Sequence, residues 1–240
     1  MLKDLARSLF RRAGVEVIAR QPRNFPRLRR PLLLREAGIT LVLDVGANSG
    51  QWAMELRRGG YQGRIVSFEP GSDAFAALER AAEGDRLWEC RQLALGSHSG
   101  TATLNLAANS VSSSLLDIAD ERVSVVGMED VEVTRLDALP DLAGPSERIL
   151  LKADVEGGEL DVLDGALGLL DRTYLLELEI SAVPLRAGQP LLGEVVHRCE
   201  GEGFVLTGIE VSYRDRATGD LLSANGFFRR QARQPPVAPL

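Results

Sequence analysis

Three acidic residues end short apolar runs, a placement that suits them to contact a ligand. They are Asp44, Glu69 and Asp154, at the ends of residues 39–44, 64–69 and 149–154. A carboxylate is costly to bury without a partner. We therefore expect these side chains at the open edge of a sheet, where water or a ligand reaches them.

The first of these acids opens a turn that contains two glycines, Asp44-Val-Gly46-Ala-Asn48-Ser-Gly50. Glycine lets a backbone come close to a ligand, and the helix expected after the turn offers free N–H groups. The Gly-x-x-x-Gly spacing differs from the Gly-x-Gly-x-x-Gly of dinucleotide sites, and Asp44 would repel a pyrophosphate. A cationic ligand such as S-adenosylmethionine, which carries sulfonium and ammonium groups, fits this turn better.

The second acid lies 25 residues further on, within Ser67-Phe68-Glu69-Pro70. A carboxylate there can accept hydrogen bonds from both hydroxyls of a ribose. A nicotinamide cofactor presents the same hydroxyls, so Glu69 alone leaves both cofactors open. The glycine spacing and the lack of a Tyr-x-x-x-Lys pair in the sequence count against a nicotinamide dehydrogenase. A cofactor-binding module without catalysis is a third interpretation.

Short apolar runs alternate with segments of helical periodicity, which predicts an α/β fold with a doubly wound, mostly parallel sheet. The predicted helices span residues 52–58, 73–83, 159–170 and 190–202. The predicted strands span residues 39–44, 64–69, 87–95, 101–106, 131–136, 149–154, 174–180, 204–211 and 221–228. Ligands bind beyond the carboxyl ends of the strands in such sheets, which is where the three acids fall.

Several motifs, taken in order, resemble those of the FkbM family of S-adenosylmethionine-dependent O-methyltransferases. The resemblance covers roughly residues 39–230 and rests on Asp44 to Gly50, Phe68-Glu-Pro70, Ala94-Leu-Gly96, Asn109 with Ser112 to Leu115, Leu151 to Glu159, Val162 to Ala166, Glu179-Ile-Ser181, Pro184-Leu185, Gly188-Gln-Pro190 and Leu222 to Arg229. It implies a class I methyltransferase fold, which is Rossmann-like, with seven strands of which the last is antiparallel.

The resemblance also implies a binding site for S-adenosylmethionine. Its expected members are Asp44, Gly46, Ala47, Asn48, Gly50, Glu69, Pro70, Ala94, Leu95, Ser113 and Asp154. Members of the family methylate hydroxyls, commonly on sugars of glycolipids and polysaccharides or on polyketide-type products. The sequence departs from residues common in the family at Arg186 and Asn225, so the resemblance does not identify the acceptor.

Methyl transfer to a hydroxyl needs a group that takes the hydroxyl proton. The two histidines are expected in an exposed turn (His98) and on a helix surface (His197). Under the resemblance, the acids Asp154, Glu156 and Glu179 lie at the rims of the fourth and fifth strands and are the expected catalytic residues. They act directly as a base, or Asp154 and Glu179 hold Mg²⁺, which prefers oxygen ligands and acidifies a hydroxyl.

Charge is unevenly distributed over the 240 residues, whose net charge is −6. Residues 1–35 carry +8 and the remainder −14. The acidic body argues against a nucleic-acid partner. We expect a basic N-terminal helical arm (1–36), interrupted at Pro22, Pro26 and Pro31, then a methyltransferase domain (37–230) and a disordered tail (231–240). The arm would contact a membrane surface, pack on the domain or support a homodimer.

The sequence also bears on the compartment. No run of about 18 apolar residues is present, and arginines interrupt the first apolar stretch, which is unlike a signal peptide. The two cysteines, Cys90 and Cys199, have no disulfide or metal-ligand pattern. A cytoplasmic location is the simplest expectation.

Overall fold

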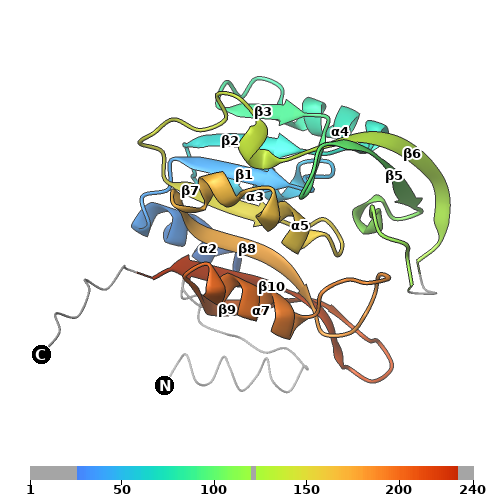
Figure 1. Ribbon diagram of the computed structural model, residues 1–240. Coiled ribbons are helices and arrows are strands. Elements are labelled where there is room, and N and C mark those ends of the chain that lie inside the picture. Colours follow the sequence, from blue (N-terminus) through green and yellow to red (C-terminus); the bar gives the residue numbers. More distant parts are fainter. Residues whose placement is uncertain (1–25, 120–122, 232–240) are drawn as a thin grey trace, which may run out of the picture.

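A computed structural model of the chain describes residues 26–119 and 123–231. Within them, seven strands form one sheet in the order β3-β2-β1-β7-β8-β10-β9 (Figure 1). In chain order these strands are β1 (Leu41–Val45), β2 (Arg64–Phe68), β3 (Trp88–Arg91), β7 (Ile149–Ala153), β8 (Thr173–Ser181), β9 (Phe204–Arg214) and β10 (Leu221–Arg230).

The sheet is parallel except for its last strand in the sequence. β1 pairs in parallel with β2 and β7, and β7 pairs in parallel with β8. β10 is antiparallel to both of its neighbours, β8 and β9. The predicted class I arrangement, with seven strands and the last antiparallel, is therefore confirmed. The strand order reverses between β1 and β7, which is the position where ligands bind in doubly wound sheets.

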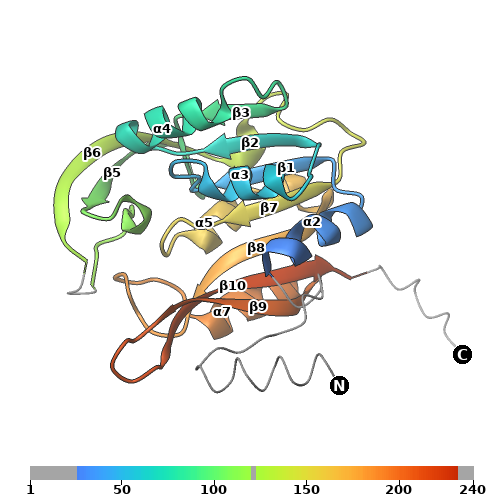
Figure 2. The ribbon, with the colours of Figure 1, turned by 180° about the vertical axis from the view of Figure 1, so that it is seen from behind.

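Helices cover both faces of this sheet. One face carries α2 (Pro26–Glu36), α3 (Gln51–Arg58) and α4 (Ser72–Ala82), of which α2 and α3 lie in front of the sheet in Figure 2. The other carries α5 (Glu159–Asp164), α6 (Leu167–Leu170) and α7 (Leu192–Gly201). The buried side chains follow this division, with Leu34, Leu56 and Leu78 packed on the first face and Val162, Leu170 and Val195 on the second.

A second, three-stranded sheet has the order β4-β6-β5. It contains β4 (Ala94–Leu95), β5 (Gly100–Ala107) and β6 (Val125–Thr134), with the short 3-10 helices η2 (Ser110–Ser112) and η3 (Leu136–Ala138) nearby in the chain. The single strand predicted over 87–95 is wrong, because β4 leaves the main sheet to pair in parallel with β6. The predicted strand 131–136 begins earlier and ends at Thr134, since Leu136 lies in η3.

The helix predicted over 159–170 is also wrong in one respect, since it is two helices separated at Gly165 and Ala166. The carbonyl of Gly96 approaches Gly165 so closely that a Cβ there would lie 2.1 Å from its oxygen. The glycine at the end of α5 thus admits the chain that follows β4. The two sheets are held together at this contact.

The described part of the basic arm is helix α2, which runs through Pro31 instead of breaking there. Arg30 is 8% exposed and Leu34 2% exposed, so this part of the arm packs on the domain. Residues 1–25 of the predicted arm and nearly all of the tail predicted at 231–240 lie outside the described residues. Among the helices that are described, none has the length and apolar character needed to span a membrane.

Candidate active site

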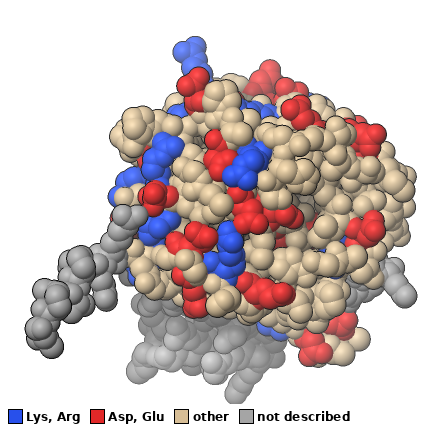
Figure 3. Space-filling model, in the orientation of Figure 1, with Lys and Arg blue, Asp and Glu red and all other residues tan. Residues whose placement is uncertain are grey.

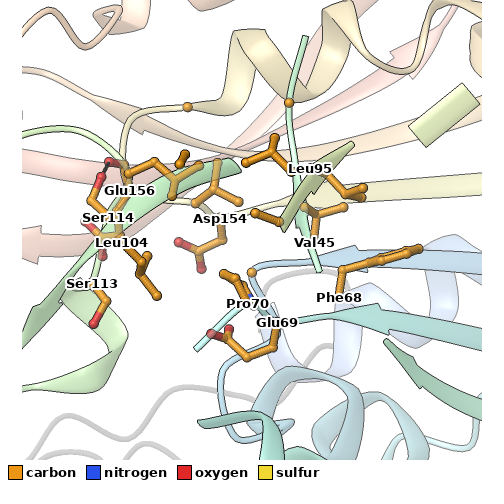
Figure 4. Close-up of a pocket in the computed structure, with 18 of the residues that line it drawn as sticks. Val45, Phe68, Glu69, Pro70, Leu95, Leu104, Ser113, Ser114, Asp154 and Glu156 are labelled. Carbon is orange, nitrogen blue, oxygen red and sulfur yellow. Dashed lines mark hydrogen bonds between the residues drawn. The ribbon is translucent and has the colours of Figure 1, made fainter. Parts of the chain in front are cut away.

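A cavity of about 300 Å³ lies beyond the carboxyl ends of β1, β2 and β7, between the two sheets. This size is at the lower end of the range for small-molecule pockets. Nine of the predicted site residues line it: Gly46, Asn48, Glu69, Pro70, Ala94, Leu95, Ser113, Asp154 and Glu156. Figure 4 shows Asp154 near the middle, its carboxylate directed into the space between Glu69 and Ser113. The predicted segments therefore meet at one cavity.

The turn after β1 needs glycine for steric reasons. Gly46 has φ +72°, and a Cβ on it would lie 1.9 Å from the carbonyl oxygen of Asp154. Asn48 is also left-handed, at φ 47°, and its side-chain oxygen accepts the N–H of Ser49 at 2.8 Å. The turn is thus pressed against the end of β7. Its backbone forms one wall of the cavity.

Asp44, which we expected to contact a ligand, is buried beneath the glycine turn. Its side chain is 0% exposed and does not line the cavity. Ser67 donates a hydrogen bond to Oδ2 at 3.0 Å, and Lys152 Nζ lies 3.2 Å from Oδ1. A buried charge persists only beside a partner, and Lys152, opposite Asp44 in the β1–β7 register, supplies it. Lys152 also donates to the carbonyl of Gly46 at 2.8 Å. The buried pair of Asp44 and Lys152 therefore supports the turn from its side away from the cavity.

Two other residues of the turn also lie behind the cavity wall. Ala47 is 2% exposed, and neither it nor Gly50 is among the lining residues. Gly50 has φ +81° and would place a Cβ 3.0 Å from Leu78 and 3.1 Å from Trp88. These two positions therefore serve the packing of the turn. The contact with a ligand that we expected of them stays a prediction.

Glu69 presents a fixed carboxylate to the cavity. Its two oxygens accept the backbone N–H groups of Asn48, at 2.8 Å, and Gly71, at 2.9 Å. Burial raises the pKa of Glu69, whereas these two N–H groups oppose the rise. Each carboxylate oxygen has a second lone pair, so the side chain keeps the capacity to accept bonds from a ligand.

Asp154, Glu156 and Glu179, hereafter the acid cluster, come together as predicted. One carboxylate oxygen from each lies within 4.8 Å of the other two. Asp154 follows β7, Glu156 lies in the next turn at a left-handed φ of 57°, and Glu179 belongs to the neighbouring strand β8. Glu179 does not line the cavity itself. It stands beside the two acids that do.

The acid cluster holds protons more strongly than ordinary carboxylates. Burial raises the pKa of Glu156 to about 8, the charge of Asp154 adds to this rise, and Arg186 opposes it. Burial also raises the pKa of Glu179 well above its usual range, with Asp154 and Glu156 adding to the effect. Such carboxylates are stronger bases than an exposed Glu once they are deprotonated.

Arg186 is the member of the site that sequence reasoning missed. It is 2% exposed, and its Nη2 lies 2.6 Å from Glu156 Oε2 and donates to the carbonyl of Ser112 at 3.0 Å. It also pairs as an isolated β-bridge with Ile118. Arg186 thereby joins the segment before α7 to the acid cluster and to the serine-rich segment. The only sequence signal was its departure from the family pattern.

The serine-rich segment forms the wall opposite the glycine turn. Ser114 donates its hydroxyl hydrogen to the carbonyl of Glu156 at 2.8 Å, and Ser113 accepts the N–H of Ala107 at 3.1 Å. Ser110 reaches the side-chain oxygen of Asn48 at 3.5 Å. These contacts link the small sheet to both the acid cluster and the glycine turn. The segment encloses the cavity through Ser110, Ser113 and Ser114, of which the sequence analysis expected Ser113.

The end of the cavity at β4 is mainly apolar, with one acid. Leu93, Leu95 and Val133 contribute apolar surface there. Asp161, at the start of α5, accepts a hydrogen bond from Ser97 at 2.9 Å and also lines this end. His98 lines the cavity but is exposed, as expected of its turn, and His197 lies exposed on α7, away from the lining. The base for the reaction is thus sought in the acid cluster.

The chain matches a known protein family and curated relatives. Residues 44–206 match the Methyltransferase FkbM domain. The chain is 32% identical to "Methyltransferase sdnD" of Sordaria araneosa, over 52% of this chain and 59% of that protein. It is 26% identical to "Methyltransferase 1" of Beauveria bassiana (strain ARSEF 2860), over 52% and 58%. The matches thus span somewhat more than half the length of these curated relatives.

Solved structures with a similar arrangement are more distant. A magnesium protoporphyrin IX methyltransferase of Synechocystis PCC 6803 with bound S-adenosylmethionine has 12% identity and a TM-score of 0.48, over 95% of this chain and 97% of that chain. A precorrin-6y C5,15-methyltransferase of Geobacter metallireducens GS-15 has 14% identity and a TM-score of 0.45, over 85% and 88%. At these values neither likeness bears on substrate.

Proposed function

The chain belongs to the FkbM family of methyltransferases, and from this premise we propose that it transfers a methyl group from S-adenosylmethionine to a hydroxyl. The acceptor belongs to a sugar, in a glycolipid, oligosaccharide or polysaccharide, or to a secondary metabolite. One observation carries the proposal: the acid cluster stands at the same cavity as the glycine turn and Glu69. A cofactor pocket and a set of bases thus share one space.

The cofactor would lie across the cavity from the glycine turn to β4. Gly46 and Asn48 border its methionine part, and Glu69 accepts hydrogen bonds from the ribose hydroxyls. Pro70, Ala94 and Leu95, which line the cavity together with Asp161, would hold the adenine. The buried pair of Asp44 and Lys152 holds the turn in place for this contact. When bound, S-adenosylmethionine supplies an electrophilic methyl group on a sulfonium.

The residues of the chain contribute placement and a base. Bound S-adenosylmethionine would give its methyl group to the oxygen of the acceptor, with the sulfur keeping the electron pair of the broken carbon–sulfur bond. A carboxylate of the acid cluster would take the hydroxyl proton. Holding the two reactants in line accounts for much of the acceleration, and general base catalysis adds roughly 10²–10⁴. Asp154 is the best placed acceptor of this proton, because its side chain is 39% exposed and that exposed surface faces the cavity.

A divalent cation is a second route at the same residues. Asp154 and Glu179 offer hard oxygen atoms close enough to share one ion, whereas Glu156 is already paired with Arg186. Mg²⁺ held there would lower the pKa of the acceptor hydroxyl. The two routes differ in their response to a chelator.

Titration calorimetry with S-adenosylmethionine and with NAD tests the cofactor. We expect binding of the first and none of the second, and the reverse would replace methyl transfer with a nicotinamide dehydrogenase. Transfer of a tritiated methyl group from S-adenosylmethionine to a panel of glycosides and glycolipids then tests catalysis. Cofactor binding without transfer to any acceptor, including cell-extracted glycans and metabolites, would favour a cofactor-binding module.

A further inference from the structure

The residues that line the cavity are unbalanced in charge. Four of them are acidic: Glu69, Asp154, Glu156 and Asp161. Among the described lining residues there is no Lys or Arg. Glu179 adds a fifth carboxylate directly behind Asp154 and Glu156. Glu69 and Asp161 lie where the cofactor would bind. An acceptor therefore meets carboxylates and backbone groups at the part of the cavity beside Asp154 and Glu156.

The two nearest basic side chains are buried and already paired with acidic residues. Lys152 is 4% exposed, and its Nζ contacts Asp44 and the carbonyls of Val45 and Gly46 and lies 3.8 Å from Asp154 Oδ2. Arg186 is 2% exposed, and it bonds Glu156 together with the carbonyls of Ser112 and Leu185. Neither offers a free positive charge to a ligand. They offset part of the negative charge from behind the wall.

The acid cluster also has unused hydrogen-bonding capacity of one kind. A carboxyl group accepts hydrogen bonds from hydroxyls whether or not a neighbouring carboxyl holds a proton. Three carboxyl groups within 4.8 Å disfavour further negative charge, and an anion beside them would find no Lys or Arg among the described lining residues to pair with. Hydroxyl groups, in contrast, donate to carboxylates and relieve the crowding.

Over the face seen in Figure 3, acidic and basic side chains are interspersed and form no extended basic surface.

Resting on the proposed function, we propose that the acceptor presents uncharged hydroxyls to the acid cluster and has no anionic group beside the hydroxyl that is methylated. Neighbouring hydroxyls of the acceptor donate to Glu156 while Asp154 faces the reacting one. Neutral polyols, such as the ring of an unmodified hexose, fit this description. Uronates and sugars phosphorylated next to the reacting hydroxyl do not.

Paired ligands that differ only in charge test this inference without any need for turnover. The protein is loaded with S-adenosylhomocysteine in the presence of EDTA, so that no metal bridges an anion to the cluster. Binding of methyl hexopyranosides and of the matching methyl hexuronides is titrated by saturation-transfer NMR. We expect the neutral member of at least one pair to bind at least roughly tenfold more tightly than its uronate. Equal binding of both members, or binding of none, would overturn the proposal.

Two variants locate the source of the selectivity. Asp154→Asn removes a carboxylate that faces the cavity and should narrow the difference in affinity between the neutral and the anionic member. Glu200→Gln removes the same charge from an exposed position on α7 and should leave that difference unchanged. An equal effect of the two would contradict a local origin. Failure of methyl transfer alone would count against the proposed function, whereas methyl transfer to the uronates as fast as to the neutral sugars would count against this inference.

Discussion

Arg186 Nη2 lies 2.6 Å from Glu156 Oε2, and both side chains are largely withdrawn from solvent. The pair ties the segment before α7 to the turn that carries the acid cluster. Glu156 stands there in a left-handed conformation that a residue other than glycine seldom adopts. Arg186 therefore holds in position a carboxylate whose backbone is strained, and it acts as a positioning residue for the acid cluster.

Replacing Arg186 by Met keeps much of the side-chain volume and removes the charge. Because Arg186 lowers the pKa of Glu156, its loss should raise that pKa above the present value of about 8. The rate of methyl transfer should then reach its plateau at a higher pH than in the wild type, while the affinity for S-adenosylmethionine stays the same. Unfolding in urea should show a loss of roughly 3–5 kcal/mol, since a buried charge loses its partner.

Two further variants check the interpretation of Arg186. Arg186→Lys keeps the charge, so the pH at which methyl transfer reaches its plateau should move back toward the wild-type value. Arg198→Met breaks a pair with Asp164 at the surface, where the side chains are 31% and 45% exposed, and should cost at most about 1 kcal/mol. An unchanged pH profile in Arg186→Met would restrict Arg186 to a structural role.

Glu69→Ala tests the cofactor site. It removes the acceptor for the ribose hydroxyls and leaves the N–H groups of Asn48 and Gly71 without a partner. We expect S-adenosylmethionine to bind more weakly by roughly 1.5–3 kcal/mol, measured by calorimetry on the folded variant. Glu69→Gln keeps one oxygen that can accept hydrogen bonds and should lose less affinity for S-adenosylmethionine. Glu79→Ala, at an exposed position of α4, serves as the control, and equal affinities in all three would remove Glu69 from the site.

A chelator separates the two routes at the acid cluster. Asp154→Asn should reduce methyl transfer by roughly 10²-fold or more with little change in cofactor affinity, because it removes the charge and keeps the shape. Activity that EDTA abolishes and Mg²⁺ restores would identify a metal at Asp154 and Glu179. Activity that is unaffected by EDTA would indicate that a carboxylate takes the hydroxyl proton directly. Full activity of both Asp154→Asn and Glu179→Gln would place the reaction elsewhere.

The sequence was informative where adjacent parallel strands decide the outcome. The acid cluster is an example, because Asp154 and Glu179 follow or end neighbouring strands whose carboxyl ends share one edge of the sheet. Glu69 is a second example, since the end of β2 lies next to the glycine turn. These placements follow from the fold class alone, and the family resemblance supplied that class.

The sequence was misleading where a partner comes from a distant segment. Asp44 was expected to face a ligand, but its partner Lys152 is fixed only by the register of β1 against β7. Arg186 reaches Glu156 across 30 residues of sequence, and no periodicity predicts that contact. The break at Gly165 depends on the approach of the Gly96 carbonyl. Each of these features is set by tertiary packing that overrides the local pattern.

Glu179→Gln should change stability in a pH-dependent way. The pKa of Glu179 is raised in the folded protein, so the folded state holds a proton there that the unfolded state has lost. The contribution of this group to stability therefore falls as pH rises above the unfolded pKa. The variant, which carries no charge, should be more stable than the wild type at about pH 8 and similar to it at about pH 4. Urea unfolding at both pH values measures this, with Glu200→Gln as control; a variant that is less stable at the higher pH would contradict the burial of a charged Glu179.

Helix α2 is anchored by a buried ion pair. Arg30 donates from Nε to Glu177 Oε2 at 2.8 Å and from Nη2 to Oε1 at 2.6 Å. Trp52 donates to the same carboxylate at 3.0 Å. Glu177 is 2% exposed. The helix therefore belongs to the folded domain, although the sequence placed it in the arm.

Two truncations test where the arm ends and the domain begins. Removal of residues 1–25 keeps Arg30 and should leave the unfolding free energy and the affinity for S-adenosylmethionine close to those of the full chain. Removal of residues 1–36 leaves the buried carboxylate of Glu177 without Arg30 and exposes the apolar surface beneath Leu34. We expect the free energy of unfolding to fall by roughly 3–5 kcal/mol from the unpaired charge alone. Arg30→Met should reproduce most of that loss. The double variant Arg30→Met with Glu177→Met should restore much of it, because no charge is then left buried. Equal stability of the two truncations in urea would show that α2 does not support the sheet.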